Sequence, residues 1–365
     1  MFNFNPITSI VLSAITAFAV VYFSIPTIVR VSKIKHLFAE PQERSAHKYS
    51  IPNLGGLSIF AGFIISISLW SDSSILKEFQ YIIAALIIIF FIGIKDDILI
   101  TAPLTKFIGQ ILAATIIVLM SDIRLTNLHG FFGIKEIGYI WSVVLSIFTI
   151  LVIINGFNFI DGVDGLSASI GIITAGAFGF WFLKSTYYQY VIISISLMSS
   201  LFSFFLFNVF GSKNKIFMGD TGSLIIGLIL SILVIKFNEF NIDKSKAFTM
   251  YPAPAVSFGV LIIPLFDMLR VMFIRFVIGK PIMQADKKHL HHQLLELGLN
   301  HIQVTLIISF VNVIFIYFVF YFSNFISIRQ LLLLILSVAL ILSYIPPILI
   351  LRKKRKEKKT DNTNS

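Results

Sequence analysis

Carboxamide and carboxylate side chains recur at every third position of the segment NGFNFIDGVDGL, residues 155–166. The four polar members are Asn155, Asn158, Asp161 and Asp164. Residues three apart on a helix lie near one another, so neighbouring members are expected to share a side. Such a row of oxygen atoms suits a hard cation such as Mg²⁺, with phosphate oxygens completing its coordination shell. The alternative is a polar loop whose Asn and Asp side chains cap helix ends.

Two apolar runs, residues 138–154 and 167–183, flank this segment, and each is about long enough to cross a bilayer. Carboxylates beside the hydrocarbon core of a membrane are costly, and proteins usually keep them for a function. The position of the segment therefore favours a functional site over a simple loop.

The composition of the whole chain is that of a membrane protein with several spans. Of its 365 residues, 57% are hydrophobic and 13% are charged, whereas about 25% are charged in typical soluble domains. The chain contains no Cys, which excludes disulfides and thiolate metal sites. The first apolar run, residues 7–29, follows no basic residue and precedes no small-residue cleavage site, so it predicts a retained helix and not a signal peptide.

Apolar runs of spanning length predict an all-α polytopic membrane protein with about eleven transmembrane helices. They cover residues 7–29, 54–70, 79–94, 107–120, 138–154, 167–183, 189–210, 222–237, 252–278, 302–323 and 328–351. The ninth run contains Pro264, which predicts a broken or bent helix. We expect a single polytopic domain at residues 1–351, with its site in cytoplasmic loops, followed by a basic cytoplasmic tail at residues 352–365.

Basic residues predict which loops face the cytoplasm. The loop after the first run, alternate loops thereafter and the C-terminal tail contain most of the 29 Lys and Arg residues. By the positive-inside rule, the N-terminus lies outside and the C-terminus in the cytoplasm. The net charge of +11 is then largely a topology signal and requires no nucleic-acid partner. The tail sequence RKKRKEKK is expected either to rest on anionic lipid headgroups or to remain solvated.

Two further segments with carboxylates fall on the predicted cytoplasmic side. Asp96 and Asp97 are adjacent, and such a pair repels unless a cation or a proton lies between its members. The alternative is a solvated pair at the membrane edge. The segment FMGDTGS, residues 217–223, opens the eighth run. There we expect either that Asp220 caps the helix or that the free N–H groups of its first turn hold phosphate. One-sided clustering favours a site for cytosolic substrates over a transporter, which more often carries charge at mid-membrane.

Three more segments contribute cations and turns. His47 and the turn IPNLGG, residues 51–56, close the first cytoplasmic loop, where the N–H groups of the turn either meet an anion or simply start a helix. Asp267 and Arg270 are three apart and are expected to pair on a helix. The sequence DKKHLHH, residues 286–292, is cationic, and because a zinc site there lacks a fourth ligand, pyrophosphate binding is favoured.

In chain order, the PNLGG turn, the Asp96-Asp97 pair, NGFNFIDGVDGL, FMGDTGS, the Asp267/Arg270 segment and HLHH resemble the motifs of one enzyme family. This family comprises the polyprenyl-phosphate N-acetylhexosamine-1-phosphate transferases, which are polytopic Mg²⁺ enzymes. The likeness extends over about residues 44–299. It implies that a lipid phosphate attacks the β-phosphate of a UDP-amino sugar, giving a lipid-diphosphate-sugar and UMP.

The resemblance also implies roles for individual side chains. The expected metal ligands, for Mg²⁺ or alternatively Mn²⁺, are Asp220 and Asn158. The expected catalytic carboxylates are Asp96, Asp97, Asp161 and Asp164. Among these, Asp96 would deprotonate or position the lipid phosphate. The expected substrate-binding residues are His47, Asn155, Phe217, Arg270, His289, His291 and His292. Phe217 would stack on uracil.

The His motif separates two branches of this family. The phospho-MurNAc-pentapeptide branch typically has three consecutive His followed by Phe-Glu, whereas this chain has HLHHQL at residues 289–294. The motif therefore resembles the bacterial GlcNAc-1-phosphate branch, which begins the synthesis of envelope polysaccharides. Asn53 departs from the Arg of many relatives and leaves the exact N-acetylhexosamine open. The alternatives are the peptidoglycan branch and, from another class, a secondary transporter or cation channel.

Partners and location follow from the same resemblance. The expected partners are undecaprenyl phosphate, a UDP-N-acetylhexosamine and the lipid bilayer, and a homodimer is compatible with the family. The expected location is the bacterial inner (plasma) membrane, with several spans and with the active site facing the cytoplasm.

Overall fold

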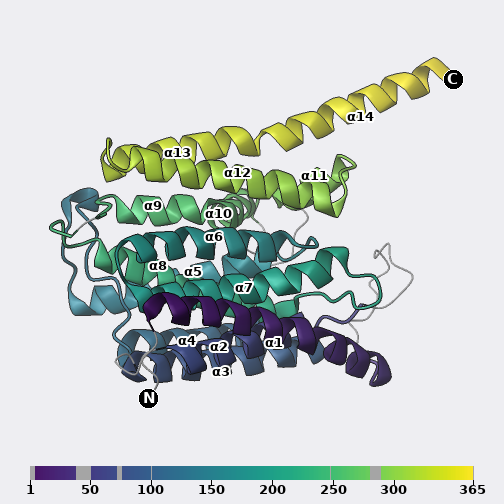
Figure 1. Ribbon diagram of the computed structural model, residues 1–365. Coiled ribbons are helices and arrows are strands. Elements are labelled where there is room, and N and C mark those ends of the chain that lie inside the picture. The colour runs from purple at the N-terminus through teal and green to yellow at the C-terminus, as the bar shows by residue number, and fades with distance from the viewer. Residues whose placement is uncertain are drawn as a thin grey trace.

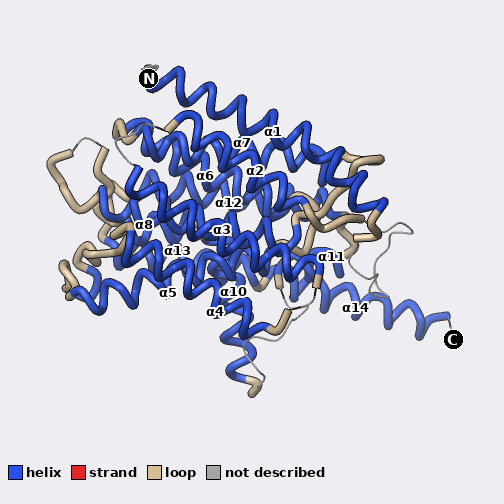
Figure 2. Tube along the Cα trace, turned by 90° about the horizontal axis from the view of Figure 1, so that it is seen from below, coloured by secondary structure: helices blue, strands red, loops and turns tan. Residues whose placement is uncertain are grey.

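The computed structural model describes residues 5–37, 51–71, 76–99, 101–246, 248–279 and 289–364. Within these ranges the regular elements are helices, accompanied by one isolated β-bridge between Asn127 and Glu136. Figure 1 shows the helices stacked as a bundle, and Figure 2, seen from below, shows the loops gathered mainly at the ends of that bundle. The all-α prediction is confirmed for the described part of the chain.

The helices follow one another along the chain in a simple order. They are α1 (Pro6–Ile34), α2 (Gly55–Trp70), α3 (Leu76–Ile98), α4 (Pro103–Thr115), the π-helix η2 (Ile116–Met120), the 3-10 helix η3 (Phe131–Gly133), α5 (Tyr139–Ile160), α6 (Leu166–Lys184), α7 (Tyr188–Phe210), α8 (Gly219–Phe240), α9 (Ala253–Val260), α10 (Ile262–Val277), α11 (Leu290–Glu296), α12 (His301–Phe322), α13 (Ile328–Ser343) and α14 (Ile345–Asn364).

In the described ranges, 8 helical segments are long and apolar enough to cross a membrane, so the chain is a multi-pass membrane protein. They are Pro6–Ile34, Pro103–Met120, Tyr139–Ile160, Leu166–Lys184, Tyr188–Phe210, Gly219–Phe240, His301–Phe322 and Ile328–Arg355. The shorter helix α2 is also apolar. The expected total of about eleven spans and the orientation of the termini stay predictions.

α8 is the central helix of the bundle. In its most apolar window 83% of the residues are buried, compared with 17% in α1. It packs against α2, α3, α5 and α6. Gly227 permits the contact with α5, because a Cβ atom at this position would meet the backbone of Ile154. The element that opens with the FMGD sequence is therefore held by neighbours from several parts of the chain.

The ninth apolar run is broken, as its proline predicts. α9 ends at Val260 and α10 begins at Ile262, with Leu261 between them. Pro264 has no N–H to donate to the carbonyl of Val260, so the hydrogen-bond ladder of one continuous helix is interrupted there. Figure 1 shows α10 nearly end-on among helices seen from the side, so the break turns α10 across the bundle.

The last apolar run continues into the basic tail as helix. α13 ends at Ser343, and α14 then runs through the basic residues to Asn364. Figure 1 shows α14 extending beyond the rest of the bundle, with the C-terminus at its far end.

Candidate active site

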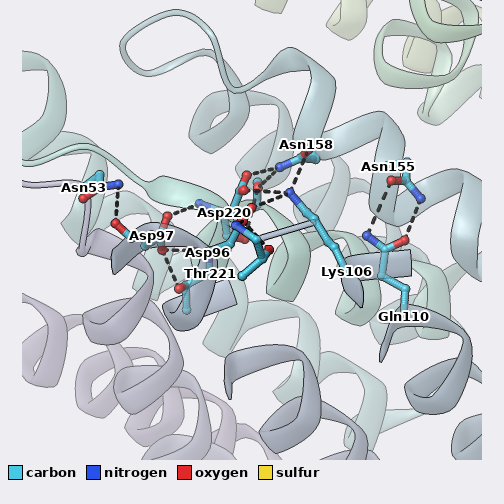
Figure 3. Close-up of polar contacts among 11 residues, drawn as sticks. Asn53, Asp96, Asp97, Lys106, Gln110, Asn155, Asn158, Asp220 and Thr221 are labelled. Carbon is cyan, nitrogen blue, oxygen red and sulfur yellow. Dashed lines mark hydrogen bonds and ion pairs between the residues drawn. The ribbon is translucent and has the colours of Figure 1, made fainter. Parts of the chain in front are cut away.

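The N-terminus of α8 is capped by a carboxylate from another helix. Asp97, near the end of α3, accepts hydrogen bonds from the N–H groups of Asp220 (2.7 Å) and Thr221 (3.0 Å) and from the Thr221 hydroxyl (2.5 Å; Figure 3). Free N–H groups and the helix dipole stabilise a carboxylate at this position. The expectation that Asp220 caps α8 is wrong, because Asp97 accepts those bonds and the Asp220 side chain makes other contacts.

Glycines let three helices approach closely enough to form this cap. A Cβ atom at Gly93 of α3 or at Gly56 of α2 would meet Thr221 of α8. Gly219 has a φ of +72°, and a Cβ atom there would also meet the Asp97 carboxylate. Larger residues at these positions would therefore push Asp97 and the start of α8 apart.

The IPNLGG turn pairs with the chain that enters α8. The N–H of Gly55 donates to the carbonyl of Phe217 (2.9 Å). The N–H of Gly56 donates to the carbonyl of Met218 (2.8 Å), and the N–H of Phe217 donates to the carbonyl of Pro52 (2.8 Å). These donors are occupied, so the turn supports the site through its backbone and does not offer these N–H groups to an anion.

Lys106, in the first turns of α4, lies at the centre of the carboxylate cluster. Its Nζ is 2.7 Å from Asp220 Oδ2, 3.3 Å from Asp96 Oδ2 and 3.4 Å from Asn158 Oδ1 (Figure 3). No motif indicated this role for Lys106, which counts in the sequence only among the basic residues of the predicted cytoplasmic loops. The available signal was a lysine at the start of an apolar run that follows the Asp96-Asp97 pair by ten residues.

Further hydrogen bonds hold the three partners of Lys106 in place. Asn158 donates from Nδ2 to Asp220 Oδ1 (2.5 Å) and to Ser223 Oγ (2.9 Å). Asp96 accepts from the N–H of Thr101 (2.9 Å) and from the Thr101 hydroxyl. The oxygen atoms around the ammonium are thus positioned by α3, α5 and α8 and by the loop before α4.

The polar series of residues 155–166 does not form one row on a helix. α5 ends at Ile160, so only the two asparagines lie in helix, while Asp161 and Asp164 lie in the connection to α6. Asn155 Nδ2 donates to Gln110 Oε1 (2.8 Å), and Figure 3 shows this pair apart from the cluster around Asp220. Asn158, Asp161 and Asp164 nevertheless line the same cavity, so these neighbours share a side as expected, but they do so across the end of α5, and Asn155 lies away from the cluster.

A cavity of about 450 Å³ opens beside the cluster. It is lined by Asn53, Asp96, Asp97, Asn158, Asp161, Gly162, Val163, Asp164, Asn208, Phe217, Met218, Gly219, Asp220 and His301. It therefore brings together most of the residues that the sequence singled out, from four separate segments. Asn208 and His301 are additions that no motif indicated. His47 lies outside the described residues.

The two aspartates of the connection have opposite electrostatic surroundings. Burial raises the pKa of Asp161 well above its usual range, and the charges of Asp220 and Asp97 act in the same direction. Burial alone would also raise the pKa of Asp164, but hydrogen bonds from His301 and Lys215 lower it overall. The Lys215 Nζ lies 2.7 Å from Asp164 Oδ2. Asp164 is therefore a fixed anion, whereas Asp161 is a carboxyl that takes up a proton more readily.

A second ion cluster surrounds Asp267. Arg270 donates from Nη2 to Asp267 Oδ1 (2.9 Å), which confirms the predicted pair. His289 Nδ1 is 2.9 Å from Asp267 Oδ2, and the N–H of Leu290 donates to the same carboxylate (3.1 Å). These contacts tie α11 to α10 across the undescribed residues 280–288.

The His motif packs against the connection that carries Asp161. His291 is 2% exposed, and a Cβ atom at Gly162 would meet its Nε2. The His289 and His291 rings stack with centroids 5.7 Å apart, and His292 lies 4.3 Å from His291. Burial lowers the pKa of His291 to about 3, with the charge of His292 acting in the same direction. Neither the three His nor Arg270 line the cavity; His291 approaches it through Gly162, which does.

The residues around Lys106 fit a magnesium ion. Across the described residues no three His, Asp or Glu side chains form a metal-binding group. Instead, three oxygen atoms of the kind that bind metal ions surround the Lys106 ammonium. They belong to the carboxylates of Asp96 and Asp220 and to the amide of Asn158. Mg²⁺ in proteins is usually held by one or two carboxylates, with waters and substrate phosphates completing the octahedron.

Comparison with known proteins gives one consistent family. The sequence model of glycosyl transferase family 4 matches residues 79–238. A decaprenyl-phosphate N-acetylglucosaminephosphotransferase of Mycobacterium tuberculosis is 31% identical over 327 residues, covering 83% of this chain and 80% of the relative. A probable undecaprenyl-phosphate N-acetylglucosaminyl 1-phosphate transferase of Bacillus subtilis is 29% identical, covering 84% of this chain and 83% of the relative.

A more distant relative has a similar name. The undecaprenyl-phosphate alpha-N-acetylglucosaminyl 1-phosphate transferase of Yersinia pestis is 25% identical over 280 residues, covering 75% of this chain and 73% of the relative. The residues matched by the family model, 79–238, include all of the cavity lining except Asn53 and His301. The chain therefore belongs to glycosyl transferase family 4, among the polyprenyl-phosphate N-acetylhexosamine-1-phosphate transferases.

Proposed function

We propose that this protein transfers GlcNAc-1-phosphate from UDP-GlcNAc to a polyprenyl phosphate, with undecaprenyl phosphate as the acceptor, and releases UMP. The relatives named above are GlcNAc-1-phosphate transferases that use decaprenyl or undecaprenyl phosphate. The observation that carries the proposal in this chain is the convergence of Asp96, Asn158 and Asp220 on one cationic position beside a polar cavity.

The reaction exchanges one phosphorus–oxygen bond for another. An oxygen of the lipid phosphate attacks the β-phosphorus of UDP-GlcNAc, and the bond from that phosphorus to the bridging oxygen breaks, so UMP leaves with the bridging oxygen. Phosphoryl transfer of this kind depends mainly on positioning and on neutralising negative charge. A bound Mg²⁺ would supply a divalent positive charge to the phosphate oxygens, and the residues that would hold it are Asp220 and Asn158, with Asp96 beside them.

The surrounding residues supply orientation and proton transfer. Phe217 lines the cavity and is available to stack on the uracil ring. Asp96 was the expected proton acceptor, but its carboxylate is engaged by Thr101 and Lys106. Asp161 lines the same cavity and has a raised pKa. We therefore assign the uptake of a lipid-phosphate proton to Asp161, and the positioning of charge to Asp96.

An apolar cavity of about 290 Å³ supports a lipid acceptor. Its lining includes Leu125, Phe148, Val152, Val234, Phe258, Leu261, Leu265 and Leu269. Leu265 and Leu269 lie on α10, the helix that also carries Asp267 and Arg270.

The active site is assigned to the cytoplasmic face of a bacterial plasma membrane. The basic loops and tail favour that side, and the nucleotide-sugar donor is a cytosolic compound. The product would be the first lipid-linked intermediate of an envelope polysaccharide.

The test is UMP release by detergent-purified protein given undecaprenyl phosphate and Mg²⁺, with UDP-GlcNAc, UDP-GalNAc and UDP-MurNAc-pentapeptide in separate reactions. The proposal expects release with UDP-GlcNAc that requires both the lipid and Mg²⁺. Release only with UDP-MurNAc-pentapeptide would instead assign the protein to the peptidoglycan branch. No release with any donor, from folded protein, would overturn the proposed reaction.

A further inference from the structure

Lys106 fills a position that is shaped for a cation. Its ammonium has three N–H donors, and three oxygen acceptors surround it, from Asp220 at 2.7 Å, Asp96 at 3.3 Å and Asn158 at 3.4 Å. The Lys106 side chain is 17% exposed, compared with 14% for Asp96 and 30% for Asp220. The donors and acceptors are thus matched in number at a site with limited access to water.

The carboxylates around this position need a positive charge between them. Asp96 and Asp220 both direct an oxygen toward the same point, and Asp97 and Asp161 line the same cavity. Carboxylates gathered in a partly buried site repel one another unless a cation lies between them. Lys106 is the cation that the chain itself supplies there.

A divalent ion and the ammonium cannot both occupy this position. Mg²⁺ binds oxygen at about 2.0–2.1 Å. On Asp220 it would lie within a few ångströms of the Lys106 Nζ, where the two positive charges repel. The lysine side chain has a flexible four-carbon stem, so it is the partner that moves.

We propose that Lys106 is an internal counter-ion that occupies the divalent-cation site in the metal-free enzyme and is displaced from Asp220 when the cation binds. This inference rests on the proposed function, because it takes Asp220 as a cation ligand. Displacement frees the ammonium for the phosphate oxygens of a ligand in the same cavity. Cation binding and nucleotide-sugar binding are then positively coupled through one side chain.

The test is Mn²⁺ affinity measured by electron paramagnetic resonance on the full-length, chelator-treated protein in detergent, without substrates. Lys106→Gln removes the competing ammonium, so we expect it to bind Mn²⁺ about tenfold more tightly than the wild type. Unchanged or weaker binding by this variant would overturn the proposal.

Lys215 provides a matched control for a general charge effect. It is 20% exposed and lies 2.7 Å from Asp164, so it resembles Lys106 in exposure and in contact distance, but it does not contact Asp220. Lys215→Gln should change Mn²⁺ affinity by less than about twofold. An equal tightening in both variants would show that net charge, and not occupation of the site, sets the affinity.

A third variant separates this inference from the proposed function. Asp220→Asn should abolish the tight Mn²⁺ site, and a wild type that binds no Mn²⁺ would overturn both the metal assignment and the counter-ion. Wild-type binding that depends on Asp220 but is not tightened by Lys106→Gln would overturn the counter-ion alone.

A measurement on the wild type covers the case in which Lys106→Gln does not fold. Acylation of lysines, followed by mass spectrometry, should label Lys106 severalfold faster with Mg²⁺ than with chelator, while the labelling of Lys215 stays constant. Equal labelling of Lys106 in both conditions would contradict displacement.

Discussion

Two carboxylates, Asp220 and Asp267, each lie beside a basic side chain, yet their surroundings differ. The Asp267 side chain is 3% exposed and accepts hydrogen bonds from Arg270, from His289 and from a backbone N–H. The Asp220 side chain is 30% exposed, contacts Lys106 and lines the polar cavity. The cluster around Asp267, here the closed cluster, joins α10 to α11. The cluster around Asp220, here the open cluster, retains a face for a ligand. We therefore expect similar ion pairs to serve structure around Asp267 and binding around Asp220.

The largest effect is expected at the open cluster. Asp220→Asn should lower turnover about 1000-fold, because it removes a negative charge that would hold the cation next to the substrate phosphates. The midpoint of thermal unfolding should change little, since a partly exposed ion pair adds little stability. Steady-state UMP release and thermal unfolding in detergent measure the two quantities. Near-normal turnover would remove Asp220 from the site.

The closed cluster should show the opposite pattern. Asp267→Ala removes a buried carboxylate that accepts hydrogen bonds from Arg270, His289 and the N–H of Leu290, which should lower the free energy of unfolding by about 3 kcal/mol. Denaturation in detergent, compared with the Asp220→Asn variant, measures this difference. If Asp267→Ala were as stable as the wild type, the closed cluster would not be structural.

Substitution of Asp97 is expected to lower both turnover and stability, each by an intermediate amount. Asp97→Ala removes the cap of α8 and should cost about 1–2 kcal/mol of stability. It also loosens the helix turn that carries Asp220, so turnover should fall about 100-fold. Asp97→Asn keeps one acceptor oxygen and should retain more stability than Asp97→Ala. Identical stability losses in the two variants would argue against capping.

A smaller effect should appear as a pH dependence of stability. The pKa of His291 is about 3 in the folded protein and about 6.5 when unfolded. Between these values the unfolded chain binds a proton that the folded chain does not, so stability falls as pH drops below about 6.5. His291→Gln should flatten this decline in unfolding temperature between pH 7.5 and pH 5. A slope in His291→Gln equal to that of the wild type would contradict this origin of the pH dependence.

The smallest effect is expected at the end of α14. Deleting residues 356–365 keeps the exposed pair of Lys354 with Glu296 and removes no residue of either cluster. Turnover should therefore stay within about twofold of the wild type. Complete inactivity of the correctly inserted protein would assign the tail a role in catalysis.

Local patterns predicted several features of this fold. Pro264 indicated the break between α9 and α10, because the loss of a backbone donor acts within one helical turn. The spacing of Asp267 and Arg270 indicated their pair for the same local reason. The carboxylate motifs also indicated most of the cavity lining.

Contacts between distant segments were not predictable from one sequence. Lys106 and Asp220 are 114 residues apart, and Asp97 and Asp220 are 123 apart. Nothing in the local spacing distinguishes a lysine that marks topology from one that fills a site. The end of α5 at Ile160 was also missed, because the period of three in residues 155–164 continues past the end of the helix.

The most direct test of the central claim is the mass of the lipid product. Purified protein is incubated with UDP-GlcNAc, undecaprenyl phosphate and Mg²⁺, and the organic phase is examined by mass spectrometry, with Asp220→Asn as the control. We expect undecaprenyl diphosphate carrying one GlcNAc, formed together with UMP and absent from the control. A lipid that remains undecaprenyl phosphate in the presence of folded wild-type protein would contradict it.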